Sequence, residues 1–142
     1  IVFVGDSAVE EDYSLSAIGW ASTKNLPILF IVEDNNLSIL TEKKVRRNWE
    51  MHHVAKGMGI KSFNISDDPL DIRKHLEGVF TEPILLNINT VRKYWHAGAG
   101  TDGENFDRYQ EEMNYLGNDG IKLHEENEKK IREAWKKQLE RQ

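Results

Sequence analysis

The sequence predicts a doubly wound α/β fold with a mostly parallel sheet. Four short apolar segments are separated by stretches that suit helices, and three of the four are continuous runs of Ile, Val, Leu and Phe. Such runs are typical of strands buried on both faces of a parallel sheet, whereas half-exposed antiparallel strands alternate. The alternating order of strands and helices implies right-handed crossovers and helices on both faces. The strands are expected over residues 1–4, 28–32, 62–65 and 84–88.

Three helices are expected to connect these strands, over residues 11–24, 49–58 and 69–79. In the first of them, Ala17, Ile18 and Ala21 lie on one side, as the helical period requires of a face that packs on a sheet. The third opens with Pro69, which fits a first helical turn because that position needs no N–H donor.

The remainder of the chain differs in character. Residues 90–117 are rich in glycine, aromatic and charged side chains, which indicates a long ordered loop with one short helix. From residue 124 to the end, Ile131, Trp135 and Leu139 are spaced four apart and predict an amphipathic C-terminal helix. Glutamates placed four residues before lysines or arginines add favourable ion pairs along this helix.

The composition limits the function classes. The chain has 142 residues, of which 39 % are apolar, and its formal net charge is −5. Net acidity gives no electrostatic footprint for a nucleic-acid backbone, and no apolar run approaches the roughly 18–20 residues of a membrane span. A sequence without cysteine excludes a disulfide framework, a thiolate zinc site and thiol catalysis. The sequence opens inside an apolar run without methionine, so we expect a domain cut from a longer protein.

Polar segments follow three of the predicted strands. Residues 5–8 come after the first strand, residues 33–36 after the second and residues 90–96 after the fourth. Ligands of an open parallel sheet bind beyond the carboxyl ends of its strands. We therefore expect these three segments at one edge of the sheet, together with any ligand site.

Asp6 and Asn35 each stand at the tip of a predicted strand. Carboxylate and amide oxygens suit Mg²⁺ or Ca²⁺, and Mg²⁺ completes its octahedron with water and ligand phosphates. Beside them, Gly5 permits close backbone approach, and the amides of Ser7 and Ala8 lie in a strand-to-helix turn that favours an anion. The pattern suits a metal–diphosphate site. Asp and Asn also commonly end strands for turn formation, so spacing alone leaves both interpretations open.

Two charged segments have a plainer interpretation. The basic run Lys43-Lys44-Val45-Arg46-Arg47 is typical of a solvated loop in an acidic chain, with contact to a partner or a phosphate left open. Glu10 and Glu11 fit the first turn of the first helix, where acidic side chains favour the helix dipole.

These motifs resemble those of thiamine diphosphate-dependent enzymes. Gly5-Asp6-Ser7, with Asn35 standing 29 positions after Asp6, is similar to the Gly-Asp-Gly and the later Asn-Asn of that group. More narrowly, the chain resembles the alpha subunit of the dehydrogenase component of 2-oxo acid dehydrogenase complexes. Residues 26–33 and 83–86 are similar to strands of that subunit, and Thr90-Val91-Arg92 is similar to its Thr-Tyr-Arg turn. His96 stands where that family keeps an active-site histidine, and the resemblance covers residues 1 to about 120.

The resemblance implies a thiamine diphosphate-binding fold that holds thiamine diphosphate and Mg²⁺. It implies that Mg²⁺ is coordinated by the side chains of Asp6 and Asn35 and by the backbone carbonyl of Leu37. The implied cofactor contacts are Gly5, Asp6, Ser7, Ala8, Glu11, Asn35, Leu37, Ile39, Arg92 and His96. His96 is also the implied catalytic residue, because a histidine there can donate hydrogen bonds to phosphate and to a developing oxyanion.

The implied activity is the oxidative decarboxylation of a 2-oxo acid, in which carbon dioxide leaves and the acyl unit passes to a lipoyl group. In this family the glutamate that activates the cofactor belongs to a partner. The chain is therefore expected to form half a site, as an oligomer with a pyrimidine-binding domain or beta-type subunit and with a lipoyl-bearing acyltransferase. Such an enzyme fits the bacterial cytoplasm or the mitochondrial matrix, and the cytoplasm is preferred. A transketolase-like or other thiamine diphosphate-dependent carboligase or decarboxylase, and a non-catalytic partner-binding domain, are the alternatives.

Residues 1–120 are expected to form the cofactor domain, and residues 121–142 a helix that packs on it or on a partner. Three departures from the family pattern bear on activity. Ser7 replaces a glycine, so the backbone there must avoid positive φ. Asp34 replaces the first asparagine of the pair and adds a negative charge near an anion site. Tyr94 replaces a histidine and can donate a hydrogen bond, but it carries no positive charge.

Overall fold

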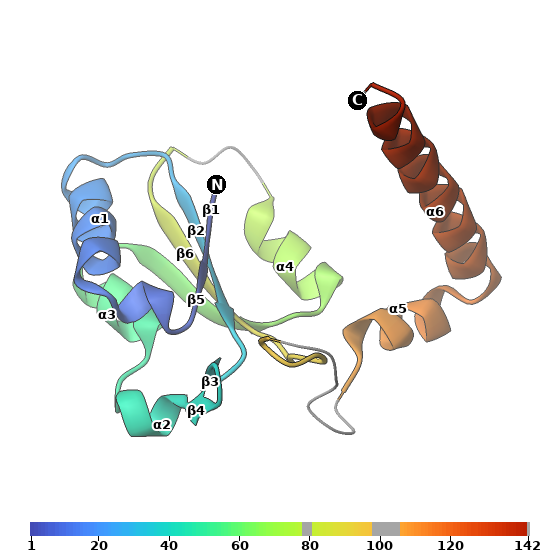
Figure 1. Cartoon of the computed structure of the whole chain (residues 1–142). Coiled ribbons are helices and arrows are strands. Elements are labelled where there is room, and N and C mark those ends of the chain that lie inside the picture. The colour runs from blue at the N-terminus through green and yellow to red at the C-terminus, as the bar shows by residue number, and fades with distance from the viewer. Residues whose placement is uncertain (78–80, 98–105, 142) are drawn as a thin grey trace. The chain divides into compact units, whose positions relative to one another are not determined.

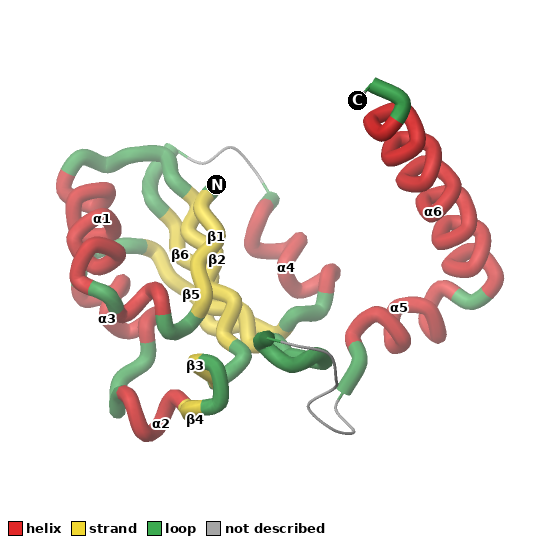
Figure 2. The backbone as a smooth tube through the Cα atoms, viewed as in Figure 1, coloured by secondary structure: helices red, strands yellow, loops and turns green. Residues whose placement is uncertain are grey.

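The sheet predicted from the sequence is present. The computed structural model describes residues 1–77, 81–97 and 106–141. Within them, four strands form one sheet in the order β1-β2-β6-β5 (Figure 1, Figure 2). These strands are β1 (Val2–Gly5), β2 (Leu29–Asp34), β5 (Lys61–Ser66) and β6 (Ile84–Asn89). Every pairing in this sheet is parallel, which confirms the predicted α/β fold.

Helices cover both faces of the sheet, as a doubly wound fold requires. The helices are α1 (Asp12–Thr23), α3 (Met51–Gly57) and α4 (Pro69–Leu76). Figure 1 shows α1 and α3 on one face and α4 on the other. Because successive residues of a strand point to opposite faces, Phe30 and Val32 of β2 join the core beneath α1 and α3. Leu29 and Ile31 join the second core, on the face that α4 covers.

Helix α4 begins where its proline predicts. The Asp68 carboxylate accepts hydrogen bonds from the backbone N–H groups of Leu70 at 2.7 Å and Asp71 at 3.4 Å. An aspartate in this position satisfies donors for which the first turn of a helix has no internal acceptor. The helix ends at Leu76, and residues 78 and 79 of the predicted range lie outside the described residues.

Strand β1 is more exposed than its sequence predicts. Its continuous apolar run predicts burial on both faces, but Phe3 is 64 % exposed and Val2 is also exposed. Among the described residues β1 pairs with β2 alone, so it forms an edge of the sheet. The prediction of full burial is wrong for this strand, because α4 packs against β5 at the opposite edge and leaves Phe3 uncovered.

Short elements that the sequence does not predict lie beyond the carboxyl ends of β1 and β2 (Figure 1). They are the 3₁₀ turn η1 (Ala8–Glu10), the hairpin strands β3 (Leu37–Ser38) and β4 (Thr41–Glu42), and α2 (Lys43–Arg46). The hairpin turns at Ile39, whose φ of 56° lies in the left-handed region. A β-branched residue rarely adopts that conformation, so the turn is strained.

Phe106–Gln142 form a second compact unit, built from α5 (Arg108–Leu116) and α6 (Asn118–Leu139). Gly117 separates the two helices with a φ of 55°, which glycine adopts without steric cost. The C-terminal helix therefore begins at Asn118, directly after this break, rather than near residue 124. The units divide after Asn105, and the predicted division at residue 120 and the packing of the last helix on a partner stay predictions.

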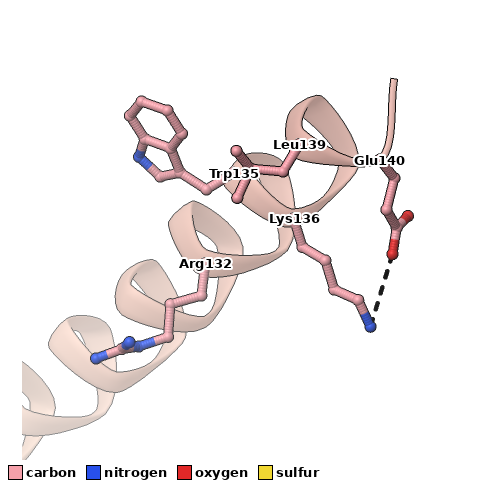
Figure 3. A pocket seen from close by; sticks show the side chains of 5 residues that line it. All are labelled: Arg132, Trp135, Lys136, Leu139 and Glu140. Atoms are coloured by element: carbon pink, nitrogen blue, oxygen red, sulfur yellow. Dashed lines mark ion pairs between the residues drawn. The ribbon is translucent and has the colours of Figure 1, made fainter. Parts of the chain in front are cut away.

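The predicted apolar stripe is present on α6. Ile131, Trp135 and Leu139 are all more than half exposed, and Trp135 is 65 % exposed. Figure 3 shows the side chains near the end of this helix that line a surface pocket. They are Arg132, Trp135, Lys136, Leu139 and Glu140. Lys136 and Glu140 form an ion pair there at 3.9 Å. None of the described helices combines the length and apolar character that crossing a membrane demands.

Candidate functional site

The segments that follow β1, β2 and β6 meet at one edge of the sheet. The backbone N–H of Asp6 donates to the Glu33 carbonyl at 3.2 Å, which continues the register of β1 and β2. On the other side of β2, the Thr90 N–H donates to the Asp34 carbonyl at 2.8 Å. The predicted convergence of these three segments is therefore confirmed.

Asp6 is buried at the end of β1 and pairs with arginine. Its Oδ2 accepts a hydrogen bond from Arg46 Nη2 at 2.5 Å, and its carbonyl accepts one from Arg47 Nη1 at 2.8 Å. Arg46 also pairs with Glu10 in η1. Burial raises the pKa of the Asp6 carboxyl, and the hydrogen bond from Arg46 offsets only part of that rise. Asp6 is thus a desolvated carboxyl whose ionised form depends on a neighbouring cation.

Asp34 is buried at the end of β2 and has its own cation. Its Oδ2 accepts hydrogen bonds from Lys43 Nζ at 2.7 Å and from Asn87 Nδ2 at 3.1 Å. Its Oδ1 accepts one from the backbone N–H of Asn36 at 3.1 Å. Burial alone would raise the pKa of the Asp34 carboxyl, but the hydrogen bonds from Lys43 and Asn87 outweigh it, so the pKa lies below its usual value. The negative charge that Asp34 adds to this edge is therefore balanced locally.

These contacts form two neighbouring groups, one around Lys43 and one around Arg46 and Arg47, which we together call the strand-end cluster. Its members are Asp6, Glu10, Asp34, Lys43, Arg46, Arg47 and Glu50. The cluster joins η1, the ends of β1 and β2, and α2, and it reaches the residue that precedes α3. It contains one more acid than base, so an additional cation at this edge meets net attraction.

The interpretation of residues 43–47 as a solvated loop is wrong for most of that run. The Arg47 side chain is 1 % exposed and its guanidinium lies over the Trp49 ring at 4.7 Å, while Lys43 and Arg46 are half-buried. Only Lys44, which is 76 % exposed and pairs with Glu42, fits the predicted role as a basic side chain in solvent. The available signal for this pairing was a basic run a few residues after β2, the strand that ends in Asp34.

Asn35 has the turn role that spacing alone left open. Its Oδ1 accepts a hydrogen bond from the backbone N–H of Leu37 at 3.0 Å, which shapes the entry to the β3–β4 hairpin. Arg92, which follows β6, donates from Nη1 to the carbonyl of Ile39 at 2.7 Å. The structure therefore brings Asn35, Leu37, Ile39 and Arg92 together at the carboxyl edge of the sheet.

The backbone after β1 leaves room for a ligand. A Cβ at Gly5 would meet nothing within 4 Å, so the packing of the described residues does not itself require glycine there. Ser7 has a φ of −85°, which confirms that the backbone avoids the left-handed region, and Ala8 begins η1. A serine at the third motif position is thus compatible with the fold.

Two expected cofactor residues, Glu11 and His96, are exposed at the surface. Glu11 is exposed at the start of α1, and its neighbour Glu10 joins the cluster instead. His96 is exposed in the segment after β6, as is Tyr94. The cofactor and catalytic roles expected for Glu11 and His96 stay predictions.

The donor chemistry at this edge fits a magnesium–diphosphate group. The buried carboxylate of Asp6, the amide oxygen of Asn35 and the carbonyl of Leu37 are hard oxygen donors, and Mg²⁺ takes few protein ligands beside water and phosphate. Among the described residues, the Nε and Nη2 groups of Arg47 are buried without a hydrogen-bond partner. Both groups can donate a hydrogen bond to a phosphate oxygen. Because Arg46 donates to Asp6 Oδ2, a metal ion at Asp6 would bind Oδ1 or displace Arg46 from Oδ2.

Comparison with known proteins gives one family match and two similar solved structures. The family described as dehydrogenase E1 component matches residues 1–139. A transketolase from Campylobacter jejuni subsp. jejuni superposes with a TM-score of 0.57 and 26 % identity, over 62 % of this chain and 15 % of the transketolase. A protein from Mycobacterium smegmatis described as a thiamin diphosphate-dependent enzyme gives a TM-score of 0.46 and 21 % identity, over 63 % of this chain and 17 % of that one.

The comparison with curated protein sequences gave no match. The matched region spans less than a fifth of either solved structure. The family match covers almost the whole sequence and confirms the resemblance drawn from the strand-end motifs. The chain belongs to the dehydrogenase E1 component family.

Proposed function

We propose that this chain forms the diphosphate- and magnesium-binding half of a thiamine diphosphate-dependent enzyme that decarboxylates a 2-oxo acid oxidatively. The observation that carries the proposal is the meeting of the Asp6 and Asn35 segments at the carboxyl edge of a parallel sheet. That edge is where such sheets bind ligands, and the family match extends over both segments.

Most of the predicted site residues have a definite part in this proposal. Mg²⁺ would be held by Asp6, Asn35 and the Leu37 carbonyl. The diphosphate would lie against the backbone of residues 5–8, where the open space at Gly5 admits it. Arg92 would neutralise phosphate charge from the hairpin side, since it already contacts the carbonyl of Ile39. Bound there, thiamine diphosphate would supply the nucleophilic carbon and the electron sink for decarboxylation.

His96 would act on the substrate side of the site. Its exposure keeps the imidazole accessible to a bound anion, and it follows β6 on the same edge as the Asp34 carbonyl contact. A histidine in that position donates a hydrogen bond to phosphate or to an oxyanion that develops on the substrate. Tyr94 offers a second hydroxyl donor in the same segment.

The site would be completed by other polypeptides. We propose a pyrimidine-binding domain or a beta-type subunit as the partner that activates the cofactor, and a lipoyl-bearing acyltransferase as the acyl acceptor, in an oligomer of the cytoplasm or the mitochondrial matrix. The isolated chain with thiamine diphosphate, Mg²⁺ and a 2-oxo acid should then give no turnover. Carbon dioxide release by the purified chain would contradict the half-site proposal.

Calorimetric titration with Mg²⁺ and thiamine diphosphate tests the binding site directly. Asp6→Asn keeps the side-chain shape and an acceptor for Arg46 but loses the charge that binds the ion. Affinity should fall at least about tenfold, which is about 1.4 kcal/mol, because the ion loses the only charged protein ligand proposed for it. Asp12→Asn is the matched control, since Asp12 is exposed in the first turn of α1. Equal affinity in both variants would overturn the proposed site.

A transketolase-like reaction is the second candidate, and the superposition on a transketolase favours it. The two candidates use the same cofactor edge and differ in the acceptor. Assays of the assembled enzyme with a 2-oxo acid plus a lipoyl domain, and with a ketose phosphate plus an aldose, separate them. A non-catalytic domain predicts that neither substrate pair reacts and that Asp6→Asn leaves cofactor binding unchanged.

A further inference from the structure

Arg46 forms an ion pair with Asp6, the carboxylate that the proposed metal ion would bind. Its Nη2 lies 2.5 Å from Asp6 Oδ2, and its other terminal nitrogen pairs with Glu10. The Asp6 side chain is almost wholly buried, so the ion pair is little screened by water. A guanidinium and a divalent cation repel each other, so a metal ion that binds Asp6 weakens the contact between Asp6 and Arg46.

The arginines of the cluster carry donors that nothing in the described part of the chain uses. Arg46 Nε, Arg47 Nε and Arg47 Nη2 are buried without a hydrogen-bond partner. Buried donors are almost always paired in folded proteins, so three together at one edge require an acceptor such as ordered water or an anion. Oxygens of a diphosphate are acceptors of the right charge, and they favour guanidinium donors.

The two arginines differ in how firmly they are held. Arg47 donates to the backbone carbonyl of Asp6, stacks on Trp49 and is 1 % exposed. Arg46 ends a four-residue helix whose residues are all exposed or half-buried, so little apolar packing opposes its movement. Arg46 is therefore the member of the pair that can change partners.

We propose that Arg46 is an exchangeable counter-ion at this edge, pairing with Asp6 when the site is empty and with diphosphate oxygen when Mg²⁺ takes Asp6. This inference rests on the proposed function. It assigns Arg46 two opposite effects: it weakens binding of the metal alone, because it competes for Asp6, and it strengthens binding of the metal–diphosphate group, because it supplies a cation. A residue with a purely structural role would move both affinities in the same direction.

Binding of Mn²⁺ alone, followed by the loss of the free-ion electron paramagnetic resonance signal, tests the first effect on the full chain. Arg46→Met should bind Mn²⁺ about tenfold more tightly than the wild type, since the competing charged hydrogen bond is gone. Titration of inorganic pyrophosphate in excess Mg²⁺ tests the second, and there Arg46→Met should bind about tenfold more weakly. Lys44→Met is the control: it removes the same charge from the same helix, but Lys44 pairs with Glu42.

The outcomes separate this inference from the proposed function. Arg46→Met and Lys44→Met behaving alike would overturn the exchange while leaving the metal site intact. A wild-type chain that binds no Mn²⁺ would overturn the proposed site and the exchange with it. Should Arg46→Met fail to fold, the Nε–Hε resonance of Arg46 in the wild type serves instead: it should shift when Mg²⁺ and pyrophosphate are added together, and an unmoved resonance would overturn the exchange.

Discussion

Replacing Lys43 by methionine tests whether the strand-end cluster stabilises the edge that carries the proposed site. Lys43 Nζ lies 2.7 Å from Asp34 Oδ2 and 2.9 Å from Glu50 Oε2, and the Asp34 side chain is 2 % exposed. Methionine keeps the length of the stem and leaves a buried carboxylate without its cation. Removing one partner of a buried ion pair costs about 3–5 kcal/mol. Because Lys43 is partly exposed, we expect the lower end, a loss of about 3 kcal/mol in the free energy of unfolding.

A double-mutant cycle measures the interaction energy between Lys43 and Asp34. Asp34→Asn leaves Lys43 paired with Glu50, which is the more exposed partner, so we expect a loss of about 1–2 kcal/mol. The double variant has no charge at either position, and its loss should fall short of the sum of the singles by about 2 kcal/mol. Urea unfolding followed by tryptophan fluorescence measures each protein. Lys44→Met is the control and should change stability by less than about 1 kcal/mol, because its partner Glu42 is on the surface.

The pH dependence of stability gives a second measurement. The pKa of Asp34 lies below 3.8 in the folded chain, since the hydrogen bonds from Lys43 and Asn87 outweigh its burial. A carboxyl of this kind adds stability above its unfolded pKa and loses it as pH falls through the folded pKa. The wild type should therefore lose this contribution below pH 3.8, and Asp34→Asn should not. Additivity in the cycle, or a Lys43→Met protein as stable as the wild type, would refute the reasoning.

Three further substitutions test neighbouring features. Ile39→Gly should raise the free energy of unfolding by about 0.5–1 kcal/mol in denaturant titration, because glycine adopts the φ of 56° without strain. The same variant should bind thiamine diphosphate more weakly. A lower free energy of unfolding would contradict the strain at Ile39. Gly5→Ala should change stability by less than about 0.5 kcal/mol, since the added Cβ meets open space, yet weaken pyrophosphate binding measured by calorimetry. Trp135→Ser should change the free energy of unfolding of the isolated chain by less than about 0.5 kcal/mol relative to the wild type, because Trp135 is 65 % exposed. A larger loss would mean that the apolar stripe of α6 already packs against other residues of the chain.

The main elements of the fold follow from local patterns. The predicted strands lie within a residue or two of β1, β2, β5 and β6. For β1, β2 and β6 the signal is a continuous apolar run, which is typical of strands in a parallel sheet. The start of α4 follows from Pro69 with the aspartate before it. The edge position of β1 could not be predicted, because the exposure of Phe3 depends on which strand α4 covers and not on the sequence of β1.

The contacts of the strand-end cluster could not be predicted from local sequence patterns. The hairpin before α2 turns at Ile39 and Leu40, which lack the glycine or asparagine that marks such turns, and α2 itself is shorter than a helix that propensity can predict. Its central ion pair joins Asp6 to Arg46, which are 40 positions apart in the chain. Sequence identified the acids at the strand tips as a possible site, but their cations became visible only through tertiary contacts.

The two departures at Asp34 and Tyr94 can be judged by the charges beside them. Asp34 adds a negative charge where the family resemblance has an asparagine, and Lys43 neutralises it at 2.7 Å. Tyr94 removes a group that could become cationic, and Lys93 Nζ lies 5.9 Å from the Tyr94 ring centroid, so a positive charge is retained in that segment. In both places a basic side chain lies beside the departure. The Lys43–Asp34 pair stabilises the fold whether or not a ligand binds, so the pyrophosphate titration decides between an anion-binding site and a non-catalytic partner-binding domain.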